Sequence, residues 1–180
     1  MASRRMIAIE LFFDPPTDRA VRDVWAALDR AGIGSLATTH SRQHPHLTLA
    51  VTDEPPPMII DRLGAELPAL PRIGLDAAGC FPGRGGVVFL AVRATPELLA
   101  YHQALHTILD EYEPRQVDQL RPGRFFPHCT VAKGLDEDRI GPAVAVARGL
   151  VPISGAATSI NAVVVGSGEI TSIDRPRPAR

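Results

Sequence analysis

The sequence contains the order proline, histidine, any residue, threonine, apolar residue twice, as Pro45-His46-Leu47-Thr48-Leu49 and as Pro127-His128-Cys129-Thr130-Val131. Along a β-strand, residues two positions apart point to the same face, so each copy would place one imidazole and one hydroxyl side by side. Two such strands that face each other would surround one small space with two imidazoles and two hydroxyls. This arrangement constrains the fold, because it requires segments 82 residues apart to converge.

The elements around the motif recur in the same order. An apolar strand begins at Met6, is followed by a helix and a loop, and leads to the first motif strand. A second apolar strand begins 81 residues later, at Val87, and the same order leads to the second motif strand. The similar offsets predict an α+β, bilobal duplicated fold with repeats over residues 6–52 and 87–133. The two lobes would be related by a pseudo-two-fold axis, with mostly antiparallel sheet, outer helices and a central cleft.

We expect a single domain over residues 1–174 and a flexible tail over residues 175–180. In the first repeat, helical spacing of apolar residues predicts a helix from about residue 18 to 31, capped by Thr17 or Asp18, with this apolar stripe: Val21, Val24, Trp25, Leu28. In the second repeat, Thr95 caps a helix whose first residue is Pro96. The remaining predicted elements are helices over 58–67 and 137–148 and strands over 72–81, 151–154 and 159–165.

The composition is that of a globular protein, with 45% hydrophobic and 22% charged residues. A net charge of −1 argues against a protein that coats long nucleic acid, but a short or terminal nucleic-acid substrate needs only a few local arginines. Cys80 and Cys129 are expected to be buried free thiols in a reducing compartment. The apolar run at the N-terminus is too short for an export signal, and we expect a cytoplasmic protein without membrane contact, for which a monomer is plausible.

Histidine titrates near neutral pH, so one imidazole can accept a proton while the other donates one. At a 2',3'-cyclic phosphate, one ring would activate water and the other would protonate the departing ribose oxygen. Thr48 and Thr130 would donate hydrogen bonds to the non-bridging oxygens, where negative charge builds up in the transition state. This chemistry requires no metal and no cofactor, and in reverse it would join a cyclic end to a 5'-hydroxyl.

These two motifs and the strand–helix order of both repeats resemble the 2H phosphoesterase superfamily, in particular its 2'-5' RNA ligase-like and cyclic phosphodiesterase branch. The resemblance implies an enzyme acting on 2',3'-cyclic or 2'-5'-linked nucleotides or RNA ends. It also implies that His46 is the acid for the leaving oxygen and that His128 is the base for water. Because relatives often carry a basic residue after the second motif, it implies a phosphate contact for Lys133, although strict strand alternation would turn this side chain away from His128.

Further substrate contacts are expected from residues near the motifs. Phe126 shares a face with His128 by alternation and is the candidate for stacking on a nucleobase, while His44 shares a face with His46. Arginines on loops could steer the phosphate: Arg42, Arg84, Arg124.

Two other functions are compatible with the sequence. His102 and His106 are four residues apart on a predicted helix, a spacing that can bind zinc, but no third ligand lies nearby and we expect a solvated helix face. A metal-dependent hydrolase could nevertheless draw on these ligands: His44, His46, His102, His106, Asp53. The other alternative is a non-catalytic protein that binds nucleotides or RNA ends. Cys129 alternates with His128 and Thr130 and should point into the core rather than act as a nucleophile.

Overall fold

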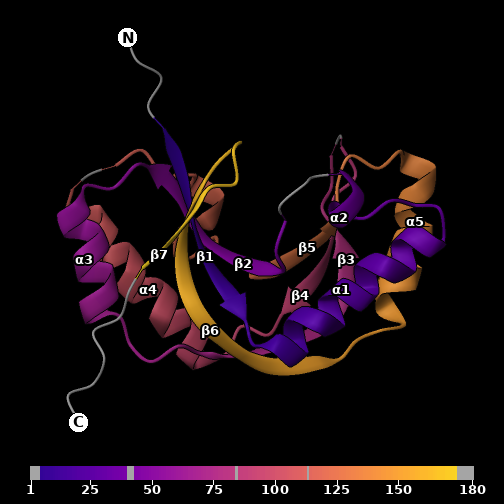
Figure 1. Ribbon diagram of the computed structural model, residues 1–180, viewed down its shortest axis with the longest axis horizontal. Helices are drawn as coiled ribbons and strands as arrows, with labels where there is room; N and C mark the ends of the chain where they lie inside the picture. Colours follow the sequence, from indigo (N-terminus) through magenta and orange to yellow (C-terminus); the bar gives the residue numbers. More distant parts are fainter. Residues whose placement is uncertain (1–4, 40–42, 84, 113, 174–180) are drawn as a thin grey trace.

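The computed structural model describes residues 5–39, 43–83, 85–112 and 114–173. The elements, in chain order, are β1 (Met6–Phe13), α1 (Pro15–Arg30), α2 (Leu36–Thr39), β2 (His46–Asp53), α3 (Pro57–Glu66), β3 (Arg72–Cys80), β4 (Val88–Val92), α4 (Pro96–Asp110), the 3-10 helix η1 (Asp118–Leu120), β5 (His128–Ala132), α5 (Glu137–Arg148), β6 (Ile153–Val164) and β7 (Ile170–Ser172). The seven strands form one sheet in the order β2-β1-β6-β3-β4-β5, with β7 added beside β6, and every pairing is antiparallel. The predicted α+β fold class, with β1–α1–β2 repeated as β4–α4–β5, is confirmed (Figure 1).

Strand β6 joins the two halves of the sheet (Figure 1). Its first part, residues 153–156, pairs with β3, and its second part, residues 157–164, pairs with β1. The sequence predicted two separate strands here, which is wrong, because β6 bends without interruption. At the bend, a Cβ on Gly155 would lie 1.7 Å from the Thr17 hydroxyl, so only glycine fits against the start of α1. The continuous strand therefore fixes one half of the molecule relative to the other.

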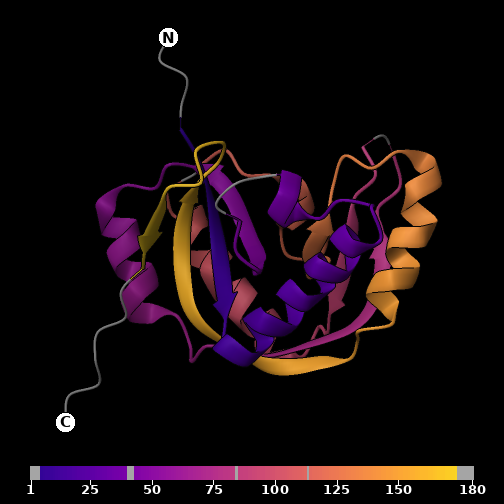
Figure 2. The same cartoon turned by 45° about the vertical axis from the view of Figure 1, so that its right-hand side comes forward.

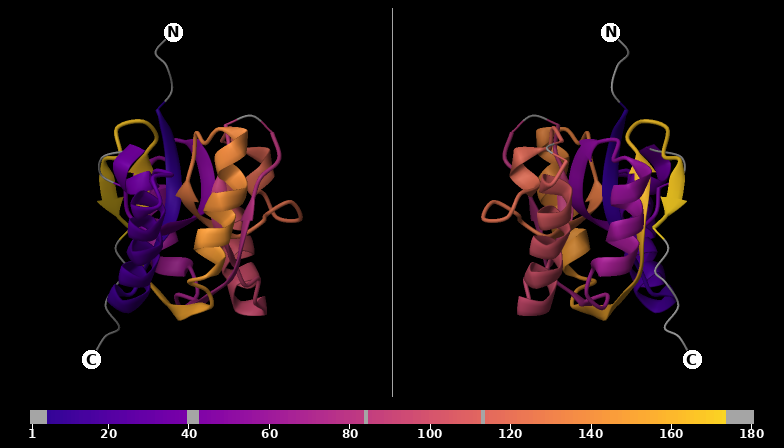
Figure 3. Two further views of the ribbon diagram at one scale, coloured as in Figure 1. Left: turned by 90° about the vertical axis from the view of Figure 1, so that its right-hand side faces the viewer. Right: turned by 90° about the vertical axis from the view of Figure 1, so that its left-hand side faces the viewer.

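The helices that follow the two leading strands are exchanged between the halves. Helix α1 follows β1 but packs against α5 and β5, whereas α4 follows β4 but packs against α3 and bonds to β2. In Figures 1 and 2, α1, α2 and α5 lie beside β3, β4 and β5, and α3 and α4 lie on the opposite side of the molecule. Each half of the sheet is thus covered by a helix from the other repeat; in Figure 3 the left view faces the side with α1 and α5, and the right view faces the side with α3 and α4.

Both motif strands carry a β-bulge at the same position. In β2, Leu49 has no partner between the pairs that Ile9 and Glu10 of β1 make, and in β5 Val131 is skipped in the same way opposite β4. A bulge changes the alternation of side chains and bends the strand locally. The two motif strands contact each other, and the backbone N–H of His46 donates to the sulfur of Cys129. The starts of the two motifs are therefore held together.

Several local predictions need correction. The cap of α1 is Asp14 rather than Thr17 or Asp18, since its carboxylate accepts a hydrogen bond from Thr17 N at 2.8 Å and another from Ala156 N at 2.8 Å. The Thr95 cap of α4 is confirmed, with a bond from Leu98 N of 3.2 Å. The loop predicted before the first motif contains the short helix α2, and β7 was not predicted. The predicted tail lies outside the described residues. None of the described helices is long and apolar enough to cross a membrane.

Candidate active site

The two motif histidines are held in the same way. The Nδ1 atom of His46 lies 2.6 Å from the carbonyl oxygen of His44, and Nδ1 of His128 lies 2.8 Å from the carbonyl oxygen of Phe126. A carbonyl oxygen only accepts hydrogen bonds, so Nδ1 carries the proton in both rings. In the neutral form of each ring, Nε2 is therefore the basic atom. Two identical side-chain-to-backbone bonds thus set the tautomer and the orientation of both imidazoles.

The environment of His46 is polar. Its Nε2 lies 3.5 Å from Oε1 of Glu10, a residue of β1 that is only 8% exposed. Burial raises the pKa of the Glu10 carboxyl, and the charge of a protonated His46 acts in the opposite direction. Glu10 was not predicted as a site residue. The sequence does contain one indication of its role. Alternation along β1 puts Glu10, a charged residue, on the face opposite this buried apolar row: Ile7, Ile9, Leu11, Phe13.

The environment of His128 is aromatic. Its ring centroid lies 4.7 Å from that of Phe81 and 5.6 Å from that of Phe89, both in edge-on geometry. Phe126 completes this aromatic cluster at 6.3 Å and is 48% exposed. Burial lowers the pKa of His128, against the bond to the Phe126 carbonyl, and the charge of His46 lowers the pKa further. His128 is thus favoured in its neutral form and lies within electrostatic reach of His46.

The difference between the two environments comes from one pair of equivalent positions. Glu10 of β1 pairs with Thr48, and Phe89 of β4 pairs with Thr130, so the two residues occupy the same place in the two repeats. A carboxylate stabilises a positively charged imidazole, whereas a buried aromatic environment favours a neutral one. Two histidines with matched backbone bonds therefore lie in different electrostatic environments, one beside a carboxylate and one among aromatic rings.

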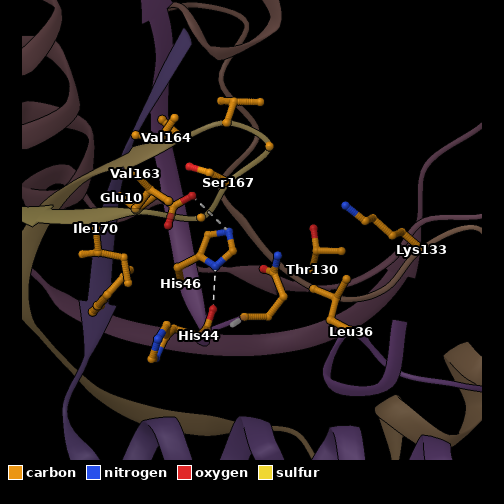
Figure 4. Close-up of a pocket in the computed structure, with 16 residues that line it drawn as sticks. Glu10, Leu36, His44, His46, Thr130, Lys133, Val163, Val164, Ser167 and Ile170 are labelled. Atoms are coloured by element: carbon orange, nitrogen blue, oxygen red, sulfur yellow. Dashed lines mark hydrogen bonds and ion pairs between the residues drawn. The ribbon is translucent and has the colours of Figure 1, made fainter. Parts of the chain in front are cut away.

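A cavity of about 730 Å³ lies over β1 and the end of β6 and reaches one residue of each motif strand (Figure 4). His46 and Glu10 line one side, Thr130 and Lys133 line the other, and the connection between β6 and β7 forms a further wall. Thr48 and His128 are not among the lining residues, although each is the partner of a lining residue within its own motif. The cavity therefore draws one functional side chain from each of the two motifs.

The predicted substrate-binding residues lie at different distances from this cavity. Lys133 lines it, because β5 is bulged and ends at Ala132, so the strict alternation that would have turned the lysine away does not extend to it. His44 also lines the cavity and stacks on Phe12 with the ring centroids 5.4 Å apart. Arg124 is exposed, forms an ion pair with Asp118 and does not line the cavity. Arg42 and Arg84 lie outside the described residues.

The sequence predicted that His102 and His106 lie on a solvated helix face. This prediction is wrong, because both side chains are buried. Their Nε2 atoms lie 3.1 and 3.2 Å from the carbonyl oxygen of Leu49, the bulge residue of β2. Burial lowers the pKa of both rings, to about 4 for His102, whose ring also stacks on Phe125 at 3.8 Å. The missed signal is that both histidines continue the buried stripe of α4: Leu98, Tyr101, Leu105, Leu109.

The part of the chain that the structure describes contains no assembled metal site of the kind that a metal-dependent hydrolase requires. No three His, Cys, Asp or Glu side chains converge there, and Asp53 is paired with Arg115 at 3.2 Å. Cys129 is buried as predicted, and burial raises the pKa of its thiol to about 12, so it stays protonated. Cys80 is exposed at the end of β3, so the prediction that it is a core thiol was wrong.

Comparison with known proteins gives a family match over residues 13–169, to the model described as the 2'-5' RNA ligase superfamily. A search of curated proteins found no match. Among solved structures, a crystal structure of a phosphoesterase is similar with a TM-score of 0.56, 16% identity and 94% of each chain covered. A structure of Usb1 from Kluyveromyces marxianus is similar with a TM-score of 0.53 and 12% identity, covering 97% of this chain and 100% of that one.

At these identities the solved structures show a common fold only, whereas the family match spans most of the sequence and includes both motifs. The protein therefore belongs to the 2'-5' RNA ligase superfamily, as the resemblance of its two motifs to the 2H phosphoesterases predicted.

Proposed function

We propose that the protein is a metal-independent phosphodiesterase or RNA ligase-like enzyme that acts on 2',3'-cyclic phosphates or 2'-5'-linked nucleotides or RNA ends. One observation carries the proposal: the equivalent Nδ1 bonds of His46 and His128 leave both Nε2 atoms available as proton donors or acceptors, and the two rings lie within electrostatic reach of each other. General acid and general base catalysis in one step requires one group that donates a proton and one group that accepts a proton, and two imidazoles can fill these roles.

In the proposed reaction, His128 is the base and His46 is the acid. Nε2 of His128 takes a proton from water as the water oxygen bonds to phosphorus, and the bond from phosphorus to the departing ribose oxygen breaks. That oxygen takes its proton from Nε2 of His46. The lowered pKa of His128 and the carboxylate beside His46 support this direction. For a ligase-like reaction, the same groups act in the reverse roles.

The two threonines and Lys133 would stabilise the charge on phosphorus oxygens. Thr48 and Thr130 lie two residues after the histidines on the same strand faces, so their hydroxyls would donate to the non-bridging oxygens. Lys133 lies on the cavity wall with Thr130 and would add a positive charge. Hydrogen-bond donors placed in advance where negative charge develops are often the largest single contribution to such a rate enhancement.

The substrate would lie across the site with its leaving group on the His46 side. Phe126, half exposed beside the base, would stack on a nucleobase, a contact that tolerates any base. The leaving group would occupy the cavity next to Glu10, where His44 would contact it. Arg124, Arg42 and Arg84 are proposed only as more distant groups that attract phosphate. A second similar structure is that of Kluyveromyces marxianus Usb1 with uridine monophosphate, with a TM-score of 0.50, 14% identity, and 95% of this chain and 98% of that one covered. This similarity supports the proposal of a nucleotide ligand.

The test is turnover of 2',3'-cyclic nucleotides and of short RNA with a cyclic end, in the presence of EDTA. We expect activity that survives the chelator and falls about 10²–10⁴-fold in His46→Ala and in His128→Ala. Thr107→Ala, an exposed threonine on α4, is the control for the general effect of substitution. Loss of activity in EDTA, or tight binding of product without turnover, would contradict the proposal and favour the metal-dependent or the non-catalytic alternative.

A further inference from the structure

The contact between Glu10 and His46 has a consequence for where protons lie in the resting protein. Nδ1 of His46 donates to the His44 carbonyl, so Nε2 of the neutral ring presents a lone pair. Oε1 of Glu10 lies 3.5 Å from this Nε2 atom, so an ionised Glu10 would place a negative charge beside the lone pair. Two electron pairs that face each other repel, and a carboxylate with so little solvent access is costly unless it is paired. A single proton between the two groups removes both penalties.

We propose that Glu10 and His46 share one proton between their two sites, as an ion pair across the 3.5 Å Oε1–Nε2 contact, and that Glu10 thereby keeps the acid loaded for the departing oxygen. The sharing itself follows from the contact alone, whereas its use in catalysis rests on the proposed function. Glu10 does not touch the reacting atoms in this scheme, so it is a positioning residue that acts through His46.

The other groups around this contact do not provide a competing partner. From β5, His128 carries a lowered pKa, and the Cys129 thiol stays protonated. From β6, Asn161 pairs with Glu10 in the sheet and is uncharged. His44 and Lys133 share the cavity lining with Glu10, and in the described part of the chain His46 is the basic group within ion-pair distance of it.

The sharing also explains how the site would reset. When His46 gives its proton to the leaving oxygen, Glu10 is left as a carboxylate beside a lone pair, which restores the repulsion. His128 has meanwhile gained the proton of the attacking water and releases it to solvent. One proton from solvent then reloads the Glu10–His46 pair, so each turnover leaves the proton count unchanged. The second repeat lacks this device because Phe89 occupies the position of Glu10.

The first test is nitrogen NMR of the full chain without substrate, with the imidazole signals of His46 followed against pH. We expect the Nε2 signal of His46 to report a protonated or proton-sharing ring at pH 7 and to move together with the Glu10 carboxyl signal. A signal typical of an unprotonated Nε2 at pH 7, which does not follow Glu10, would overturn the proposal. This measurement needs neither a variant nor activity.

The second test compares Glu10→Gln with Glu169→Gln. The glutamine amide can donate to Nε2 and so favours the neutral ring, whereas Glu169 is an exposed carboxylate between β6 and β7 that binds Arg5 and contacts neither motif histidine. In Glu10→Gln we expect kcat to fall about tenfold or more at pH 8 but only about two- to threefold at pH 6, where solvent supplies the proton, with KM unchanged. Glu169→Gln should keep the wild-type profile.

The two tests separate the inference from the proposed function. A shared proton seen by NMR in a protein that turns over no phosphodiester would leave the sharing intact and refute the function. An active enzyme whose pH profile is the same in Glu10→Gln and wild type would leave the function intact and refute the role of Glu10.

Discussion

Acidification should destabilise the fold through His102, which is 2% exposed beneath the first motif strand. Its pKa is about 4 in the folded protein, against 6.5 for the unfolded chain, because burial disfavours the charged ring. Between these values the unfolded chain binds the extra proton, so the free energy of unfolding falls as the pH falls through this window. Above pH 6.5 the residue is neutral in both states and contributes no pH dependence.

The window between 6.5 and about 4 corresponds to roughly 3 kcal/mol, at about 1.4 kcal/mol for each pH unit. The perturbation is His102→Gln, whose amide can still donate to the Leu49 carbonyl but does not titrate. We expect wild type to lose roughly 3 kcal/mol more than His102→Gln between pH 7 and pH 4. The free energy of unfolding is compared as a function of pH in the two proteins. The cost of losing the stacking on Phe125 is the same at every pH and so does not affect this comparison.

The assay is urea unfolding at several pH values, followed by the fluorescence of Trp25, the single tryptophan and a core residue of α1. His44→Gln is the control, since it makes the same substitution at an exposed histidine. If wild type and His102→Gln lose stability in parallel from pH 7 to pH 4, the buried neutral state of His102 is refuted.

Three further predictions concern the site and the bend of β6. Thr130→Val should lower kcat about 10²-fold by removing a donor to the phosphoryl oxygens, measured by steady-state turnover beside Thr107→Val, which should be neutral. Phe126→Leu should weaken nucleotide binding by about 1–3 kcal/mol, measured by calorimetry, with little loss of stability because the ring is half exposed; equal affinity would exclude stacking. Gly155→Ala should lower the free energy of unfolding by about 1–3 kcal/mol or more, because its Cβ overlaps the Thr17 hydroxyl, and an unchanged urea midpoint would refute the close approach.

The sequence predicted what depends on local pattern. Alternation in the two motifs predicted that each histidine and threonine flank a buried residue, and matched offsets predicted the repeated order of elements. The Thr95 cap followed from side-chain chemistry within one turn. These features depend on residues within a few positions of one another, so one sequence contains the information needed.

Features that depend on packing between distant segments were missed. The bulge at Val131 and the end of β5 at Ala132 free Lys133 from strict alternation, and no local pattern distinguishes a bulged strand from a regular one. Glu10 becomes a site residue only because β1 pairs with the first motif strand. His102 and His106 were assigned to solvent by their polarity, although the Leu49 carbonyl at the bulge provides an acceptor inside the core.

The exchanged helices determine how a substrate can enter. Separating the motif strands would strip α1 from the half that contains β5 and α4 from the half that contains β2, and so expose both hydrophobic interiors at once. A hinge motion of the kind seen in two-domain enzymes is therefore too costly for this architecture. The segments that border the cavity without covering the core are the turn between β6 and β7 and helix α2, which can move without separating the two halves.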